Sequence, residues 1–196
     1  MEFQEVINSR HSVRSYERKK VPKDILKNLI KNGCKAPSAC NRQPWNFYIV
    51  NSREKRDKVS KLLWETYQEL SEQTLKKSSK VQKISNEFYH DLGGAQNIIF
   101  AYRKKETNEP EYILPTDTIS IACAIENIVL SAVDIGLGTC IVGTFNADKV
   151  KVELGKILGV ENNEELVTSL VIGYPAKDFD PLKREKKKID EVLTFV

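Results

Sequence analysis

The sequence predicts one domain of mixed helices and strands, in the α/β or α+β class. Its 196 residues favour one domain over two and suffice to bury a core, so residues 1–196 are taken together. Several segments repeat apolar residues every three or four positions, which is typical of amphipathic helices. Short apolar runs between these segments, bounded by glycine or polar residues, indicate about four or five strands.

Helix signals and one strand account for the first third of the chain. A short helix is expected over residues 2–8, where apolar side chains share one face. Pro22 occupies a favoured first-turn position of a second helix, and Gly33 ends that helix. Residues 46–50 follow a small, polar loop as a strand, and Ser52 is a suitable N-cap for a third helix.

The middle of the chain contains a polar segment and a long apolar one. Residues 71–91 are polar and lysine-rich, and a helix and a mobile lid both stay open for them. Residues 97–102 indicate a strand, and the loop over residues 103–115 carries Tyr112 as its most exposed aromatic side chain. Residues 117–135 are expected to form a central buried helix. A membrane span is not expected for its apolar part, residues 119–135, because Glu126 and Asp134 inside it would be costly in a bilayer.

The last third is predicted to alternate between strands and a helix. Strands are expected over residues 139–142, 166–172 and 192–196, and a helix over residues 150–158. Gly143 closes the first of these strands. The chain therefore ends on apolar residues, and an unpaired strand there would be prone to association. Pairing within the same sheet and crossing to a partner subunit would both cover it.

Charge and cysteine content narrow the range of partners. The net charge is +4, from 31 basic and 27 acidic residues, and this mild excess does not indicate a nucleic-acid partner. Four cysteines without a CxxC pair and two histidines offer no spacing suited to zinc, so no metal site is expected. No apolar N-terminal segment resembles a signal peptide, so we expect a reducing cytoplasm.

The sequence contains no pattern typical of an active site made of side chains alone. Ser-His-Asp, Cys-His and paired-carboxylate arrangements are absent, as are the glycine-rich dinucleotide and phosphate-loop motifs. The chain is therefore either not an enzyme or an enzyme whose cofactor carries the reaction.

Two segments offer groups for a flat, charged ligand. Arg10, Ser12 and Arg14 can surround an oxyanion with charge-assisted hydrogen bonds, although two surface arginines would have the same spacing. Residues 37–45 combine small residues, which let a ring approach the backbone, with amides that can meet its donors and acceptors. A loop that only caps the next strand would have a similar composition.

Four blocks in this order resemble the nitroreductase family of flavoproteins. They are residues 9–14 (SRHSVR), 36–45 (APSACNRQPW), 136–143 (GLGTCIVG) and 172–175 (IGYP), followed by a basic run at 183–188. The resemblance spans nearly the whole chain. It implies an α+β sandwich with a central, mostly antiparallel sheet of about five strands flanked by helices. It also implies an intertwined homodimer with an exchanged C-terminal strand and FMN sites at the interface.

The resemblance assigns FMN-binding roles residue by residue. The implied contacts are Arg10, His11, Ser12, Arg14, Pro37, Ser38, Ala39, Asn41, Val142, Gly143, Arg184 and Lys186. Arg10, Arg184 and Lys186 would meet the FMN phosphate. Arg14 would lie near the pyrimidine edge of the flavin, where a fixed cation stabilises the reduced ring.

The remaining implied contacts come from two other parts of the fold. Pro37, Ser38, Ala39 and Asn41 would come from the partner chain. Val142 and Gly143 would place backbone amides near the central ring of the flavin.

The activity implied is hydride transfer from NADH or NADPH, through FMN, to an oxidised small-molecule acceptor such as a nitroaromatic or a quinone. Ping-pong kinetics would result, and no protein acid or base is required. Relatives of similar sequence include dehydrogenases, dehalogenases and flavin-destroying enzymes, and residues 71–91 and Tyr112 would decide between these reactions. A non-catalytic flavin-binding module is the alternative from another class.

Overall fold

The computed structural model describes residues 1–74, 79–146, 148–181 and 185–196. Its helices are α1 (Phe3–Ser9), α2 (Lys23–Gly33), α3 (Arg53–Thr74), α4 (Ser79–Asp91), α5 (Ile113–Asp134) and α6 (Asp148–Leu158). Its strands are β1 (Trp45–Val50), β2 (Asn97–Lys104), β3 (Gly138–Ile141) and β4 (Glu164–Gly173). Every predicted helix is present, as are the first four predicted strands, with ends that shift by a few residues.

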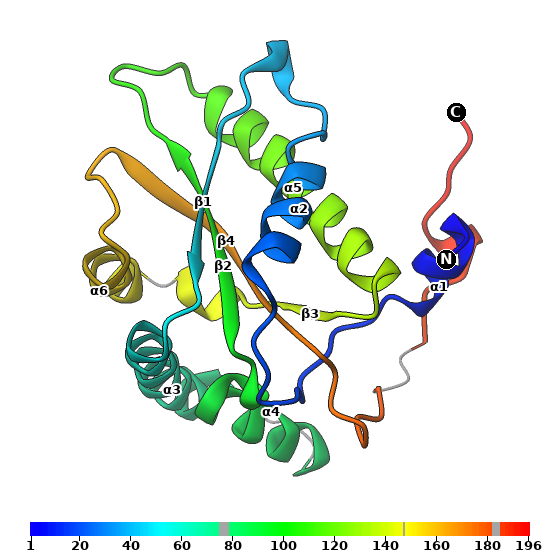
Figure 1. Ribbon diagram of the computed structural model, residues 1–196. Helices are drawn as coiled ribbons and strands as arrows, with labels where there is room; N and C mark the ends of the chain where they lie inside the picture. Colours follow the sequence, from blue (N-terminus) through cyan, green and yellow to red (C-terminus); the bar gives the residue numbers. More distant parts are fainter. Residues whose placement is uncertain (75–78, 147, 182–184) are drawn as a thin grey trace.

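The described strands form one antiparallel sheet in the order β1-β2-β4-β3. Side chains of β2 alternate between two core clusters, with Ile98 and Phe100 in one and Ile99 and Ala101 in the other. Helices α2 and α5 cover one face of the sheet, and α3, α4 and α6 cover the other (Figure 1). The prediction of an α+β sandwich around an antiparallel sheet is therefore confirmed.

The C-terminal residues differ from the prediction. After a 3₁₀ turn, η4 (Ile189–Glu191), residues 192–196 pair with no described strand, and Phe195 is 89% exposed. The expected fifth strand in the chain's own sheet is therefore wrong. The tail runs away from the sheet on the side where α1 lies (Figure 1), so no neighbouring strand is there to supply ladder hydrogen bonds. Exchange of the tail with a partner subunit stays a prediction.

Two helix starts also differ from their predicted positions. Pro22 is the N-cap of α2 rather than its first residue. α5 begins at Ile113, inside the segment expected to be a loop, and Pro115 lies in its first turn. A proline is tolerated there because the first backbone N–H groups of a helix have no partner within it. In the region 71–91, the described residues belong to α3 and α4, which confirms the helical alternative for them.

Of the described helices, α5 is long and apolar enough to cross a membrane, judged by length and composition alone. In the fold it packs against α2 and the sheet, and 44% of its most apolar window is buried. Asp117, near its start, is 1% exposed and forms an ion pair with Arg42. These are the contacts of a core helix.

Candidate functional site

The segment after α1 lies beside β3. Ser12 forms a parallel bridge with Thr139, and the Val13 N–H donates to the Thr139 carbonyl at 2.9 Å. Val13 is buried so close to Gly138 that a Cβ there would lie 2.5 Å from Val13 Cγ2. Because side chains alternate along extended backbone, Ser12 and Arg14 face away from this core contact, and both line a cavity.

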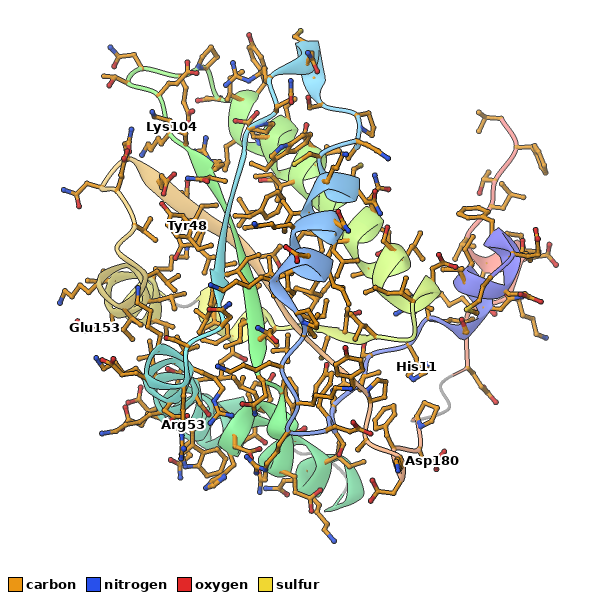
Figure 2. The ribbon with its side chains drawn as sticks, in the orientation of Figure 1. His11, Tyr48, Arg53, Lys104, Glu153 and Asp180 are labelled. Atoms are coloured by element: carbon orange, nitrogen blue, oxygen red, sulfur yellow. The ribbon has the colours of Figure 1, made fainter. Side chains whose placement is uncertain are left out.

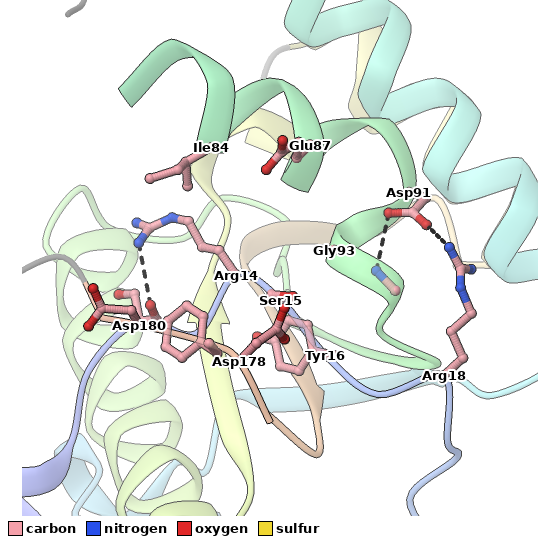
Figure 3. Close-up of a pocket in the computed structure, with 13 residues that line it drawn as sticks. Arg14, Ser15, Tyr16, Arg18, Ile84, Glu87, Asp91, Gly93, Asp178 and Asp180 are labelled. Carbon is pink, nitrogen blue, oxygen red and sulfur yellow. Dashed lines mark hydrogen bonds and ion pairs between the residues drawn. The ribbon is translucent and has the colours of Figure 1, made fainter. Parts of the chain in front are cut away.

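The cavity beside Arg14 has a volume of about 490 Å³, within the range of small-molecule sites (Figure 3). Figure 3 places the Arg14 guanidinium between Ile84 of α4 and Asp180. Gly93, with a φ of +62°, supports the Arg14 backbone from behind, because a Cβ on Gly93 would lie 2.2 Å from the Arg14 carbonyl oxygen. The left-handed conformation and the close approach both require glycine here.

Carboxylates lie around the arginines of this cavity. Its acidic lining residues are Glu87, Asp91, Asp178 and Asp180. Asp91 pairs with Arg18 at 2.5 Å and accepts the Gly94 N–H at 3.1 Å, which fixes the turn that supports Arg14. The charge of Arg14 also reaches β3, where burial raises the pKa of the Cys140 thiol and Arg14 opposes that rise.

Tyr16 holds the end of this segment in place. It is 4% exposed, its hydroxyl donates to the Val13 carbonyl at 2.6 Å, and its N–H donates to the Gly93 carbonyl at 2.8 Å. Burial raises the pKa of Tyr16 well above 10, so the hydroxyl stays a neutral donor. The backbone of residues 12–16 is thereby tied to β3 and to the turn at Gly93.

The chain after β4 lies against the same segment. The Ala176 N–H donates to the Ser15 carbonyl at 3.0 Å, and the ring of His11 stacks on Phe179 with centroids 5.5 Å apart. Figure 2 shows His11 and Asp180 at the same end of the molecule. Of the two predicted basic residues of the tail, Lys186 is exposed, and Arg184 lies outside the described residues.

The second predicted segment, residues 37–43, is a tight surface loop. Cys40, Asn41 and Gln43 all have positive φ values, between 49° and 54°, and the Gln43 N–H donates to Ser38 Oγ at 3.1 Å. Pro37 and Asn41 are exposed, whereas Ser38 and Ala39 are half-buried. Arg42 anchors the loop to the start of α5, because its Nε lies 3.3 Å from Asp117 Oδ1.

The two predicted halves of the site, residues 10–14 and residues 37–43, lie near opposite ends of helix α5. The loop is anchored at Asp117, whereas Ser12 pairs with a strand that follows the far end of α5 at Asp134. With a rise of 1.5 Å per residue, these ends of α5 are about 25 Å apart. A pocket of 1,000 Å³ is only about 10 Å across, so one chain does not bring both segments to the same ligand.

The predicted contacts at the end of β3 are only partly available. The Val142 N–H donates to the Ser169 carbonyl at 3.0 Å, and the Val142 carbonyl accepts from Ser169 Oγ at 2.7 Å. Gly143 is exposed, and a Cβ built on it would have no neighbour within 4 Å. Of the two amides, Gly143 is therefore the one whose surroundings leave room for a ligand.

Comparison with known proteins identifies the fold and the lineage. The model of the Nitroreductase family matches residues 7–174, most of the chain. The chain belongs to the nitroreductase family. It is also 26% identical to iodotyrosine deiodinase 1 of Mus musculus, over 100% of this chain and 70% of that relative.

Solved structures share the nitroreductase-family fold over the whole chain. A BluB-like flavoprotein from Clostridium difficile has a TM-score of 0.77 and 25% identity, covering 100% of this chain and 99% of its own. A nitroreductase with bound FMN from Bacteroides fragilis has a TM-score of 0.71 and 24% identity, with the same coverage.

The structure places residues beside the predicted segments that the motifs did not indicate. Gly93 and Phe179 contact the predicted segment, and Tyr89 of α4 accepts a hydrogen bond from Thr144 Oγ1 at 3.2 Å, next to Gly143. The Gly93-Gly94 pair before a strand was a usable signal of a strained turn. Phe179 and Tyr89 had no such signal, because each is one aromatic residue among many.

Proposed function

We propose that this chain binds FMN and passes reducing equivalents from NADH or NADPH to an oxidised small-molecule acceptor, a nitroaromatic or a quinone. Bound FMN supplies the redox chemistry, since it can take up a hydride and return the electrons to an acceptor. The observation that carries the proposal is Arg14, a half-buried cation held on the wall of a cavity of about 490 Å³. The FMN bound to the Bacteroides fragilis nitroreductase supports the choice of cofactor.

The described residues around Arg14, Gly143 and Arg10 suit a flavin with a phosphate chain. Arg14 offers positive charge beside the cavity, where it would stabilise the negative charge of a reduced ring. Gly143 has no side chain and no neighbour that would block a flat ring from its backbone. Arg10, half-buried before Ser12, and the exposed Lys186 are the cations that we assign to the phosphate.

The proposed site needs two chains. Ser38, Ala39 and Asn41 are too far from the Arg14 of their own chain to contact the same flavin, so we assign them to the flavin of a partner. Exposed apolar side chains on α1, α5 and the tail supply surface for such a homodimer. They include Phe3, Ile7, Leu114, Ile119, Val192 and Phe195. All four cysteines are free, which suits the reducing cytoplasm that we expect for the protein.

The visible spectrum of the purified protein is the first test. We expect a yellow protein, or one that turns yellow with added FMN, and bleaching when NADH or NADPH is added without oxygen. Reoxidation by a quinone or a nitroaromatic would complete the cycle. A protein that stays colourless with FMN contradicts the proposal, and one that binds FMN without bleaching is a flavin-binding module instead.

A pair of variants tests whether the site is shared. Arg14→Ala removes the cation from one half, and Asn41→Gly removes the amide from the other half while tolerating the φ of 54°. Each variant alone should fold and bind FMN weakly. In a hybrid dimer, one subunit carries Arg14→Ala and the other carries Asn41→Gly. If each site takes Arg14 from one subunit and Asn41 from the other, one site has both changes and the other has neither, so half of the sites should bind FMN normally. A hybrid in which both sites bind weakly places Arg14 and Asn41 in the same chain's site.

Reductive dehalogenation is a second candidate, favoured by the full-length similarity to iodotyrosine deiodinase 1. It would use the same flavin and the same cavity with a halogenated aromatic acceptor. Iodide release from 3-iodotyrosine by the reduced protein would support it. Rapid reoxidation by quinones with no iodide release favours the first candidate.

A further inference from the structure

A buried network of charges lies at the start of α5, away from the cavity that contains Arg14. At its centre is Arg103, 1% exposed, at the end of β2. Its guanidinium binds both carboxylate oxygens of Glu109, at 2.6 and 2.9 Å, and reaches Glu165 of β4 at 2.9 Å. Figure 2 shows the neighbouring Lys104 at the opposite end of the molecule from His11.

Asp117 is the least satisfied member of this network. It is 1% exposed, and its Oδ2 has no hydrogen-bond partner among the described residues. Arg103 is 3.9 Å from that oxygen, too far for a hydrogen bond. Arg42 Nε, 3.3 Å from Oδ1, is therefore the donor that pairs this buried carboxylate. The same contact raises the pKa of Arg42, so the guanidinium stays charged.

The contact joins the network to a strained loop. Cys40, Asn41 and Gln43 are non-glycine residues with positive φ, a conformation that persists only where the surroundings fix it. Arg42 lies among them, and its buried anchor is Asp117; its second ion pair, to Glu106 at 3.5 Å, is with a 66% exposed carboxylate and is therefore weaker. The hydrogen bond from Gln43 N–H to Ser38 Oγ closes the loop but does not connect it to the body of the protein.

We propose that Arg42 is a positioning residue, whose ion pair with Asp117 sets the loop at the angle that presents Ser38, Ala39 and Asn41 to the flavin. The inference rests on the proposed function, because it takes FMN as the ligand. It adds Arg42 to the residues on which the FMN site depends, although Arg42 would not contact the flavin and would act through the buried carboxylate of Asp117. Arg103 binds Glu109 and thereby fixes the loop before Tyr112 next to the start of α5, where Arg42 and Asp117 also lie.

The test compares FMN affinity with the stability of the apo-protein. Arg42→Gln keeps a polar side chain of similar length and removes the charge. Its matched control is Arg53→Gln on α3, where an 86% exposed arginine pairs with Asp57 on the surface. We expect Arg42→Gln to raise the FMN dissociation constant about tenfold, by analogy with metal sites, where the loss of a residue that orients a ligand-binding side chain has an effect of this size. Arg53→Gln should leave the constant unchanged.

If Arg42 had a purely structural role, FMN affinity would fall only together with the stability of the apo-protein. The proposal predicts that affinity falls while stability is nearly kept. The side-chain amide introduced by Arg42→Gln can still donate a hydrogen bond to Asp117, and the position is 29% exposed. The variant should therefore fold, and the apo-protein should melt within a few degrees of the wild type. Arg42→Lys keeps the charge and should recover part of the lost affinity. Unchanged FMN affinity in Arg42→Gln overturns the proposal, and so does a loss that Arg42→Lys does not reduce or that follows a collapse of the apo-protein. A wild type that binds no FMN would instead refute the proposed function.

Discussion

Gly93→Ala is the sharpest test of how the cavity is built. The substitution adds one methyl group behind the Arg14 backbone, where the new Cβ would lie 2.2 Å from the carbonyl oxygen and 2.9 Å from the carbonyl carbon. Both neighbours are main-chain atoms, so no side-chain rotation can relieve the contact. The two segments must separate by about 1 Å to restore ordinary van der Waals distances.

The expected loss of unfolding free energy in Gly93→Ala has two parts, and a matched variant separates them. Alanine at a φ of +62° costs about 1 kcal/mol, and the forced backbone movement adds about 2 kcal/mol, typical of overpacking. Gly159 has a φ of +76°, and a Cβ there would have no neighbour within 4 Å. Gly159→Ala should therefore lose only the contribution from alanine at a positive φ. At about 2–4 °C per kcal/mol for a chain of this size, Gly93→Ala should lower the Tm by about 6–12 °C and Gly159→Ala by about 2–4 °C.

Differential scanning fluorimetry and an FMN titration measure the two variants side by side. Because the movement displaces Arg14, Gly93→Ala should also weaken FMN binding, whereas Gly159→Ala should not. Equal losses of Tm would show that the Gly93 turn does not press on the Arg14 backbone. A Gly93→Ala variant that is destabilised but binds FMN normally would show that the position of Arg14 does not matter for the flavin.

Two further predictions concern the charges at the start of α5. Arg103→Met leaves Glu109 and Glu165 without the buried cation that hydrogen-bonds both of them, and it should lower the unfolding free energy by about 3–5 kcal/mol in urea titrations. A loss below about 1 kcal/mol would mean that water already screens these carboxylates. Hydrogen bonding to Arg103 lowers the pKa of Glu109 below its ordinary 4.5, so its stabilisation is complete above that value and disappears as the pH falls below it. Glu109→Gln should therefore flatten the fall in stability between about pH 5 and 3, and a slope identical to the wild type would contradict this assignment.

Much of the fold followed from local patterns in the sequence. The residues of β2 are apolar on both faces because helices cover both sides of the sheet, and a short apolar run of this kind is typical of a buried strand. Ser52 accepts the Lys55 N–H at 3.3 Å, as expected of an N-cap. The start of α5 was misplaced because Pro115 resembles a loop residue, although the first turn of a helix accepts proline.

The parts that could not be predicted depend on contacts between distant segments. Arg103 is a charged residue at the end of an apolar run and was assigned to a loop, because its partners at 109, 117 and 165 are scattered along the chain. The five C-terminal residues have the composition of a strand, but composition does not supply a neighbouring strand. In both cases the tertiary neighbours, which no local pattern encodes, determine the structure.

The geometry of the Arg10–Arg14 segment also decides how the family motifs are to be combined. In sequence order, the motif around Arg14 and the motif around Asn41 suggest two walls of one pocket. The structure separates them by the length of α5, and each motif is rigidly held where it lies, one by Gly93 and β3 and the other by Arg42 and Asp117. Neither can move about 25 Å without unfolding its anchor. If both motifs contact FMN, two copies of this chain must meet with the start of α5 in one facing the Arg14 cavity of the other.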